Sequence, residues 1–110
     1  MIPQKWKKRY HNRYRECLEL HDQHIIQYII GKEDIIIASP TSHSFLSNKF
    51  RNIRKFKTGK LRILYVLSTE RPDLWNPPIE ETEILFLFAG LRNEHTYEDA
   101  EKMLGKHSII

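Results

Sequence analysis

The chain has 110 residues, of which 40% are hydrophobic, and its formal net charge at pH 7 is +4. This length excludes two ordinary domains, so we expect residues 1–110 to form a single domain around one modest core. No apolar run approaches the roughly 18 residues of a membrane span, and no apolar stretch follows the first charges, which predicts a cytoplasmic protein without membrane contact. The single cysteine, Cys17, excludes an internal disulfide and a cysteine-based metal site.

Positive charge is concentrated in two blocks that contain no acidic residue. Residues 1–15 and 49–62 together hold thirteen of the eighteen lysines and arginines, whereas residues 70–101 hold nine carboxylates against two arginines. Such segregation predicts a surface that faces a polyanion, although a lysine-rich stretch can also serve only to keep a protein soluble. Two acid-free blocks in one small domain favour nucleic acid as the partner.

A first amphipathic helix is expected over residues 3–22. Large side chains recur there at steps of three or four, the spacing that lines one face of a helix, and they are Trp6, Tyr10, Tyr14, Cys17 and His21. The same spacing predicts that Trp6 and Tyr10 belong to the core.

A second helix is expected after Asp22, whose side chain can cap it. Isoleucines fall on one face of this helix as far as Ile30, just before Gly31. Residues 34–38 contain three consecutive isoleucines, which suit a buried strand as well as a last helical turn. Pro40 ends the segment in either case.

The second half of the chain predicts an antiparallel sheet. Residues 53–57 and 61–67 read as two strands joined by a turn at Thr58, Gly59 and Lys60, and residues 84–89 give the strongest strand pattern. Both faces of 61–67 are largely apolar, which predicts a central strand. A long connection with three prolines covers residues 68–82, and residues 97–104 favour a short C-terminal helix. The fold class is therefore α+β, a helical pair packed on an antiparallel sheet of three to four strands.

Familiar catalytic patterns are absent from the sequence. The four glycines are isolated, which excludes a glycine-rich phosphate loop, and there is no nucleophile elbow. His21 and His24 could share a helical face, but no cysteine completes a zinc site, so we expect no metal.

Cations from neighbouring strands are expected to meet on one side of the sheet. The period of two places Lys55 and Lys57 on one strand face, and Arg62 on the next strand can share that side. Like charges so close repel one another, and a bound phosphate is the simplest partner for them. Arg92 and Tyr97, just beyond the last strand, could bring another cation and a hydroxyl to the same edge. The alternative is a solvated strand whose lysines only block edge pairing.

The order of these motifs resembles the C-terminal half of the RelE/ParE toxin superfamily. The resemblance is carried by the string Lys55-Phe-Lys-Thr-Gly-Lys-Leu-Arg62-Ile-Leu-Tyr-Val, the strand ending Ala89-Gly90-Leu91-Arg92, and Tyr97. These proteins show a basic strand, a short turn, a strand opening Arg-Ile-x-Tyr, a strand ending Gly-x-Arg and a nearby tyrosine. Two departures stand out: the expected helix over 3–22 leaves no strand ahead of the helices, and the 68–82 connection is longer than the usual hairpin.

The resemblance implies a toxin of a toxin–antitoxin system that inhibits translation. RelE-like toxins are ribosome-dependent endoribonucleases that cleave mRNA by metal-independent attack of a 2′-hydroxyl, without a small-molecule cofactor, and a cognate antitoxin protein restrains them. By position, Lys55 matches the base or phosphate anchor, Arg62 and Arg92 match the charge-stabilising arginines, and Tyr97 matches the tyrosine that orients the substrate. A lysine can act as a base only where neighbouring cations lower its pKa.

Further RNA contacts are expected from Lys49, Arg51, Arg54, Lys57, Lys60 and His95. His95 is also the second choice for a catalytic role, as the acid that protonates the leaving oxygen.

Two other functions fit the same sequence. One is a ParE-like protein that inhibits DNA gyrase without nuclease activity; we would expect such a relative to lack Lys55, Arg62, Arg92 and Tyr97 as a group. The other is a non-enzymatic RNA-binding module in which Trp6, Tyr10 or Trp75 stacks on bases. For the antitoxin, the helix from Tyr97 and the loop around Trp75 are the expected docking surfaces.

Overall fold

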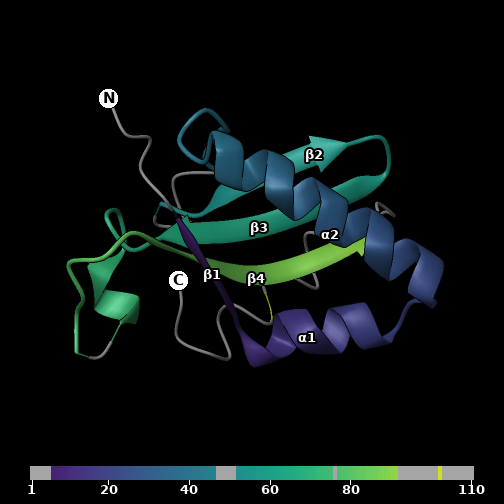
Figure 1. Cartoon of the computed structure of the whole chain (residues 1–110), viewed down its shortest axis with the longest axis horizontal. Helices are drawn as coiled ribbons and strands as arrows, with labels where there is room; N and C mark the ends of the chain where they lie inside the picture. The colour runs from purple at the N-terminus through teal and green to yellow at the C-terminus, as the bar shows by residue number, and fades with distance from the viewer. Residues whose placement is uncertain (1–5, 47–51, 76, 92–101, 103–110) are drawn as a thin grey trace.

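Four strands form one mixed sheet in the residues that the computed structural model describes, 6–46, 52–75, 77–91 and 102, and two helices pack against it (Figure 1). The spatial order of the strands is β1-β4-β3-β2, with β1 parallel to β4 and the other pairs antiparallel. The elements are β1 (Lys7–Tyr10), α1 (Asn12–Glu19), α2 (Gln23–Ala38), β2 (Arg54–Thr58), β3 (Leu61–Leu67), the 3-10 turn η1 (Pro72–Leu74) and β4 (Glu83–Leu91). The α+β prediction is confirmed, although the sheet is mixed rather than wholly antiparallel.

The first element of the described residues is a strand, in a region where the spacing of large side chains predicted a helix. Residues 7–10 pair with β4, and the flanking backbone N–H groups of Lys7 and His11 donate to the carbonyls of Thr82 and Phe86. The helix begins only at Asn12, with the His11 Nδ1 accepting from the Arg13 N–H at 3.0 Å. The helix predicted over 3–22 was therefore too long, and the expected absence of a first strand was wrong. Trp6 and Tyr10 pack against the core, as predicted.

The second helix is longer than its sequence pattern required. Asp22 caps it, as predicted, with its carboxylate accepting from the Ile25 N–H at 3.0 Å. The helix continues through Gly31 to Ala38, so residues 34–38 form its last turns and not a strand. Figure 1 shows α2 lying across one face of the sheet, with α1 beside β4.

Both faces of the sheet are covered by apolar side chains. The face toward α2 contributes Tyr65 and Phe86 to a core that also contains Tyr14, Ile29 and Ile36. We call the other side, formed by the strand residues that point away from α2, the distal face. Its core contains Leu64, Val66, Leu87, Phe88 and Trp75, the last from the 68–82 connection. Every residue of β3 is buried, which confirms the predicted central strand.

The predicted C-terminal helix over 97–104 lies outside the described residues apart from Lys102. Among the described residues, no helix is long and apolar enough to cross a membrane.

Candidate functional site

Three of the expected site residues share the distal face at the β2–β3 hairpin. Lys57 pairs with Arg62 and Lys55 pairs with Leu64, a residue of the distal core. Directly opposed residues of an antiparallel pair point to the same side of the sheet. Lys55, Lys57 and Arg62 therefore lie together, as their spacing predicted. Lys60 is exposed in the turn between the two strands.

The lysines of this group are available to an external anion. Lys57 and Lys60 are exposed and Lys55 is half-buried. Within the described part of the chain, none of the three pairs with a carboxylate. Their charges therefore add to one another at this end of the sheet, which raises the local concentration of a polyanion.

Arg62 is held in a fixed position inside this group. Only 3% of its surface is exposed, and its Nη1 donates to the carbonyls of Gly59 at 2.8 Å and Leu61 at 2.9 Å. Its Nε is buried without a hydrogen-bond partner among the described residues. A buried charged donor left unpaired is costly, and an anion that accepts from it would remove that cost.

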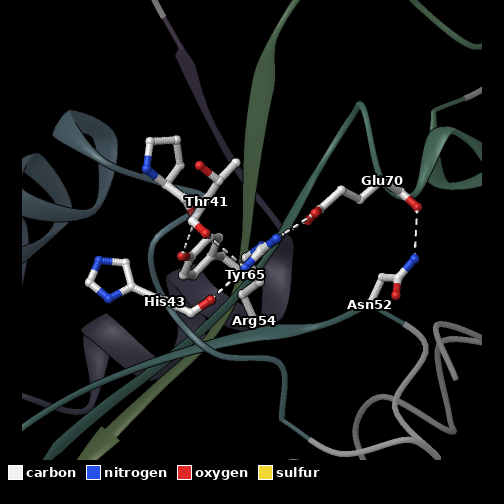
Figure 2. A network of polar contacts seen from close by, with 7 residues as sticks. Thr41, His43, Asn52, Arg54, Tyr65 and Glu70 are labelled. Atoms are coloured by element: carbon white, nitrogen blue, oxygen red, sulfur yellow. Dashed lines mark hydrogen bonds and ion pairs between the residues drawn. The ribbon is translucent and has the colours of Figure 1, made fainter.

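Arg54, expected to bind RNA, pairs with Tyr65 of the core beneath α2, so it points to the side of the sheet opposite the cation group. Its hydrogen-bond donors are occupied there (Figure 2). Its guanidinium donates to both carboxylate oxygens of Glu70, at 2.8 and 2.5 Å, and to the carbonyls of Thr41 at 3.2 Å and His43 at 2.5 Å. The hydrogen bond to Glu70 is the main cause of the raised pKa of Arg54. Tyr65 donates to the Pro40 carbonyl at 2.7 Å in the same network.

This network holds the segment after α2 against the edge of β2. The Lys55 N–H donates to the Ser44 carbonyl at 2.9 Å, and the Arg54 guanidinium lies 4.1 Å from the centre of the Phe45 ring. Arg54 thus supports the strand that carries Lys55, and it is a structural residue. Sequence reasoning missed this because its partner Glu70 comes from a distant loop.

A second buried network fixes β1 to the helices. Glu33 of α2 is fully buried and accepts from Tyr14 at 2.5 Å, Tyr10 at 2.7 Å and Lys8 at 3.2 Å. Burial, together with the Glu33 carboxylate, raises the pKa of both tyrosines. Lys8 of the first basic block is therefore engaged in the fold. No group of three or more metal-ligating side chains occurs among the described residues.

The remaining expected site residues, Lys49, Arg51, Arg92, His95 and Tyr97, lie outside the described residues. The strand that leads to them is described: Gly90 of β4 pairs with Arg62, and Leu91 pairs with Leu61. The described part of β4 thus ends at the same end of the sheet as the cation group.

Two solved structures share this architecture. A chain of the RelBE2 toxin–antitoxin complex from Mycobacterium tuberculosis superposes with a TM-score of 0.68 at 15% sequence identity, covering 83% of this chain and 95% of that one. The chain has a RelE-like fold. The isolated RelE toxin of E. coli superposes with a TM-score of 0.55 at 13% identity, covering 90% of this chain and 99% of the other. The sequence matches no protein-family model and no curated protein.

The RelE-like architecture that the order of motifs predicted is confirmed. The strand β1 also removes one of the two departures from the family pattern, because a strand does precede the helices. The long connection between β3 and β4 remains as a feature of this chain. Trp75 within it is only 4% exposed, so it does not offer its ring as an open docking or stacking surface.

Proposed function

We propose that this chain is the single-domain toxin of a toxin–antitoxin system, an endoribonuclease that cleaves mRNA on the ribosome and so inhibits translation in the cytoplasm. The RelE-like fold supports the toxin assignment, since one of these structural neighbours is a chain of the RelBE2 toxin–antitoxin complex and another is the isolated RelE toxin. The observation that carries the nuclease assignment is the group of Lys55, Lys57 and Arg62 on the distal face, which has no carboxylate partner among the described residues.

The proposed reaction is an in-line displacement within the RNA. The 2′-oxygen bonds to the adjacent phosphorus as its proton leaves, a 2′,3′-cyclic phosphate forms, and the 5′-oxygen departs with a proton. This step needs a base, cations for the charge of the phosphorane and an acid for the leaving oxygen. The chain's own residues can supply these parts, and no step requires a metal or a cofactor.

We assign the phosphorane charge to Arg62 and the phosphate anchor, or the base, to Lys55. Arg62 is suited to its part because two carbonyls hold its guanidinium before the substrate arrives, so little reorganisation accompanies the reaction. Arg92 is proposed as the second charge-stabilising arginine and Tyr97 as the residue that orients the substrate, with His95 as an alternative acid. Lys57 and Lys60 are proposed RNA contacts, as are Lys49 and Arg51. Arg54 is not retained in this set because Glu70 and two carbonyls occupy its donors.

The proposed partner protein is a cognate antitoxin. One structural neighbour is a toxin–antitoxin complex, and the basic face of this chain would attract an acidic segment of such a protein. The gene for the antitoxin is expected next to the gene for this chain.

The test is induced expression followed by primer extension on a defined mRNA. Wild type should arrest growth and produce discrete cuts, whereas Arg62→Ala, Arg92→Ala and Lys55→Ala should lower cleavage at least about a hundredfold if each acts in the transition state. Lys32→Ala, a matched change on α2, should cleave like wild type. Growth arrest with intact mRNA, unchanged by the three substitutions, would contradict the proposal and favour gyrase inhibition. Tight RNA binding without cuts would favour a non-enzymatic module.

A further inference from the structure

A cavity of about 470 Å³ lies between β1, the start of α1 and the connection from β3 to β4. Its walls include Arg9 and Asn12 on one side and Leu74, Trp75, Pro77 and Ile79 on the other. The connection that forms the second wall is the long 68–82 segment. In Figure 1 this segment is the green part with η1 beyond the left end of the sheet.

The wall formed by this connection is fixed by hydrogen bonds. Trp75 donates from its Nε1 to Glu83 at 2.6 Å, and its ring packs in the distal core. Ser68 donates to the Glu81 carbonyl and accepts from the Glu83 N–H, both at 2.9 Å. The cavity is therefore preformed, which is usual for a binding site, and its volume lies within the roughly 300–1,000 Å³ of ligand pockets.

Two residues of the cavity lining, Arg9 and Leu85, lie on the same side of the sheet as the cation group. Arg9 pairs with Leu85, which in turn pairs with Val66 of the distal core. Directly paired residues share a face, so Arg9 and Lys55 are both on the distal face. From strand spacing and rise, their Cα atoms are roughly 17 Å apart, a span of only a few nucleotides. The Cα–Cα distance from Lys55 to Arg9 is therefore within the length of a short RNA strand.

Arg9 retains donors for a phosphate. Its Nη1 lies 3.5 Å from a carboxylate oxygen of Glu83, an ion pair longer than a good hydrogen bond, and 60% of its side chain is exposed. An arginine in this state can accept a second anion without breaking a tight pair.

We infer that the cavity accepts one unstacked base of the RNA, with the adjoining phosphate on Arg9. Proteins that read single-stranded RNA turn bases out of the stack, hold their faces against apolar or aromatic side chains and bond their edges to polar groups. Leu74, Pro77, Ile79 and Leu85 supply apolar walls, and the amide of Asn12 can both donate and accept at the base edge. The inference rests on the proposed function insofar as RNA is the substrate, and it adds a contact away from the cleavage site that would influence where the RNA is cut.

Binding of a 2′-O-methyl RNA hexanucleotide tests the inference without cleavage, because the methyl group removes the nucleophile. Asn12 is exposed, and Asn12→Phe fills the cavity without a change in charge. We expect it to weaken binding at least about fivefold, the lower range for loss of one stacked base. Gln27→Phe, the same kind of change on exposed α2 surface, should bind like wild type. Equal affinity of Asn12→Phe and wild type would overturn the inference.

A second pair of variants tests whether Arg9 makes a specific contact with the RNA or contributes only to the overall positive charge. Arg9→Gln should weaken binding more than Arg15→Gln, which removes an exposed cation outside the cavity. If the two variants lose the same affinity, Arg9 contributes only general charge and the inference fails. In the NMR spectrum, the indole N–H signal of Trp75, identified with Trp6→Phe, should shift when the hexanucleotide binds; an unmoved signal would also overturn it.

Cleavage and antitoxin binding distinguish this inference from the proposed function. Asn12→Phe should still cut mRNA but with an altered distribution of cut positions in primer extension, and an unchanged distribution would refute the base contact alone. A wild-type chain that never cuts, yet binds the hexanucleotide in an Asn12-dependent manner, would refute the nuclease and leave the cavity assignment standing. Loss of antitoxin binding in Asn12→Phe with RNA binding intact would assign the cavity to the protein partner and overturn the inference.

Discussion

Arg54 and Arg62 lie on paired strands and differ in how fully their guanidinium groups are hydrogen-bonded. The guanidinium of Arg54 makes hydrogen bonds with Glu70 and two backbone carbonyls, whereas Arg62 bonds only nearby carbonyls and retains an unpartnered Nε among the described residues. The buried charge of Arg54 is therefore satisfied within the fold, whereas Arg62 has a donor left for an external anion. Residue type and charge are the same for these two arginines, so only the groups that contact each one in the structure distinguish them.

We expect His43 to make the stability of the fold depend on pH. Its Nε2 is buried without a partner among the described residues, and its ring packs edge-on against Phe56 at 5.1 Å. Burial, and secondarily the charge of Arg54, lowers the pKa of His43 below its ordinary 6.5. The unfolded chain therefore takes up a proton first as the pH falls, so the stability that the neutral ring contributes is present above pH 6.5 and is lost as the pH falls through the lower, folded-state pKa.

We therefore expect His43→Phe to flatten the acid limb of the stability curve. The phenyl ring keeps the contact with Phe56 but cannot take up a proton. Urea unfolding at a series of pH values from 7 down to about 5 should show a smaller loss of unfolding free energy in this variant than in wild type. His24→Phe, on the exposed side of α2, is the matched control and should retain the wild-type slope. Identical slopes for all three proteins would remove His43 as the source of the pH dependence.

At the scale of elements, the sequence pattern correctly predicted the features that depend on neighbouring residues. The strand over 61–67 and the cap at Asp22 were found where the sequence placed them, because alternation and capping act within a few residues. The helix over 3–22 was predicted too long because a parallel partner, β4, is more than seventy residues away in the chain. Pairing with β4 and the bonds of Tyr10 and Lys8 to Glu33 outweigh the helical spacing of Trp6, Tyr10 and Tyr14.

Gly31 and Gly59 provide a test of how these elements are stabilised. A Cβ at Gly31, inside α2, would have no atom within 4 Å, so Gly31→Ala should raise the unfolding free energy by about 1 kcal/mol through helix propensity and a less flexible unfolded chain. Gly59 has a φ of +53° in the β2–β3 turn, where a Cβ is strained, so Gly59→Ala should lower it by about 1–2 kcal/mol. Urea denaturation measures both. A destabilised Gly31→Ala would mean that the helix is strained or contacted at that position.

For the whole molecule, the sequence was most informative about the cation group on the distal face. The period of two brought Lys55, Lys57 and Arg62 together without any knowledge of the partner strands. The wall of the cavity could not be predicted in the same way, because the 68–82 connection has no periodic pattern and its position depends on contacts of Trp75 and Ser68 with Glu83. Strand periodicity therefore predicts that Lys55, Lys57 and Arg62 lie together, whereas the walls of the cavity could not be predicted.

The cation group and the cavity of the distal face should differ in how they affect the salt dependence of RNA binding. Each phosphate neutralised on a single strand contributes about −0.7 to the slope of log K against log salt concentration, because it releases a counterion. Lys57→Gln should lower the magnitude of the slope by about 0.7, since the exposed Lys57 faces a phosphate in the proposed complex. Asn12→Phe should lower affinity at every salt concentration and leave the slope unchanged, because Arg9 keeps the adjoining phosphate and the base itself releases no counterion. Fluorescence anisotropy with the 2′-O-methyl hexanucleotide measures both quantities. If Asn12→Phe changed the slope as Lys57→Gln does, the contact that it removes would be with a phosphate, and the assignment of the cavity to a base would be wrong.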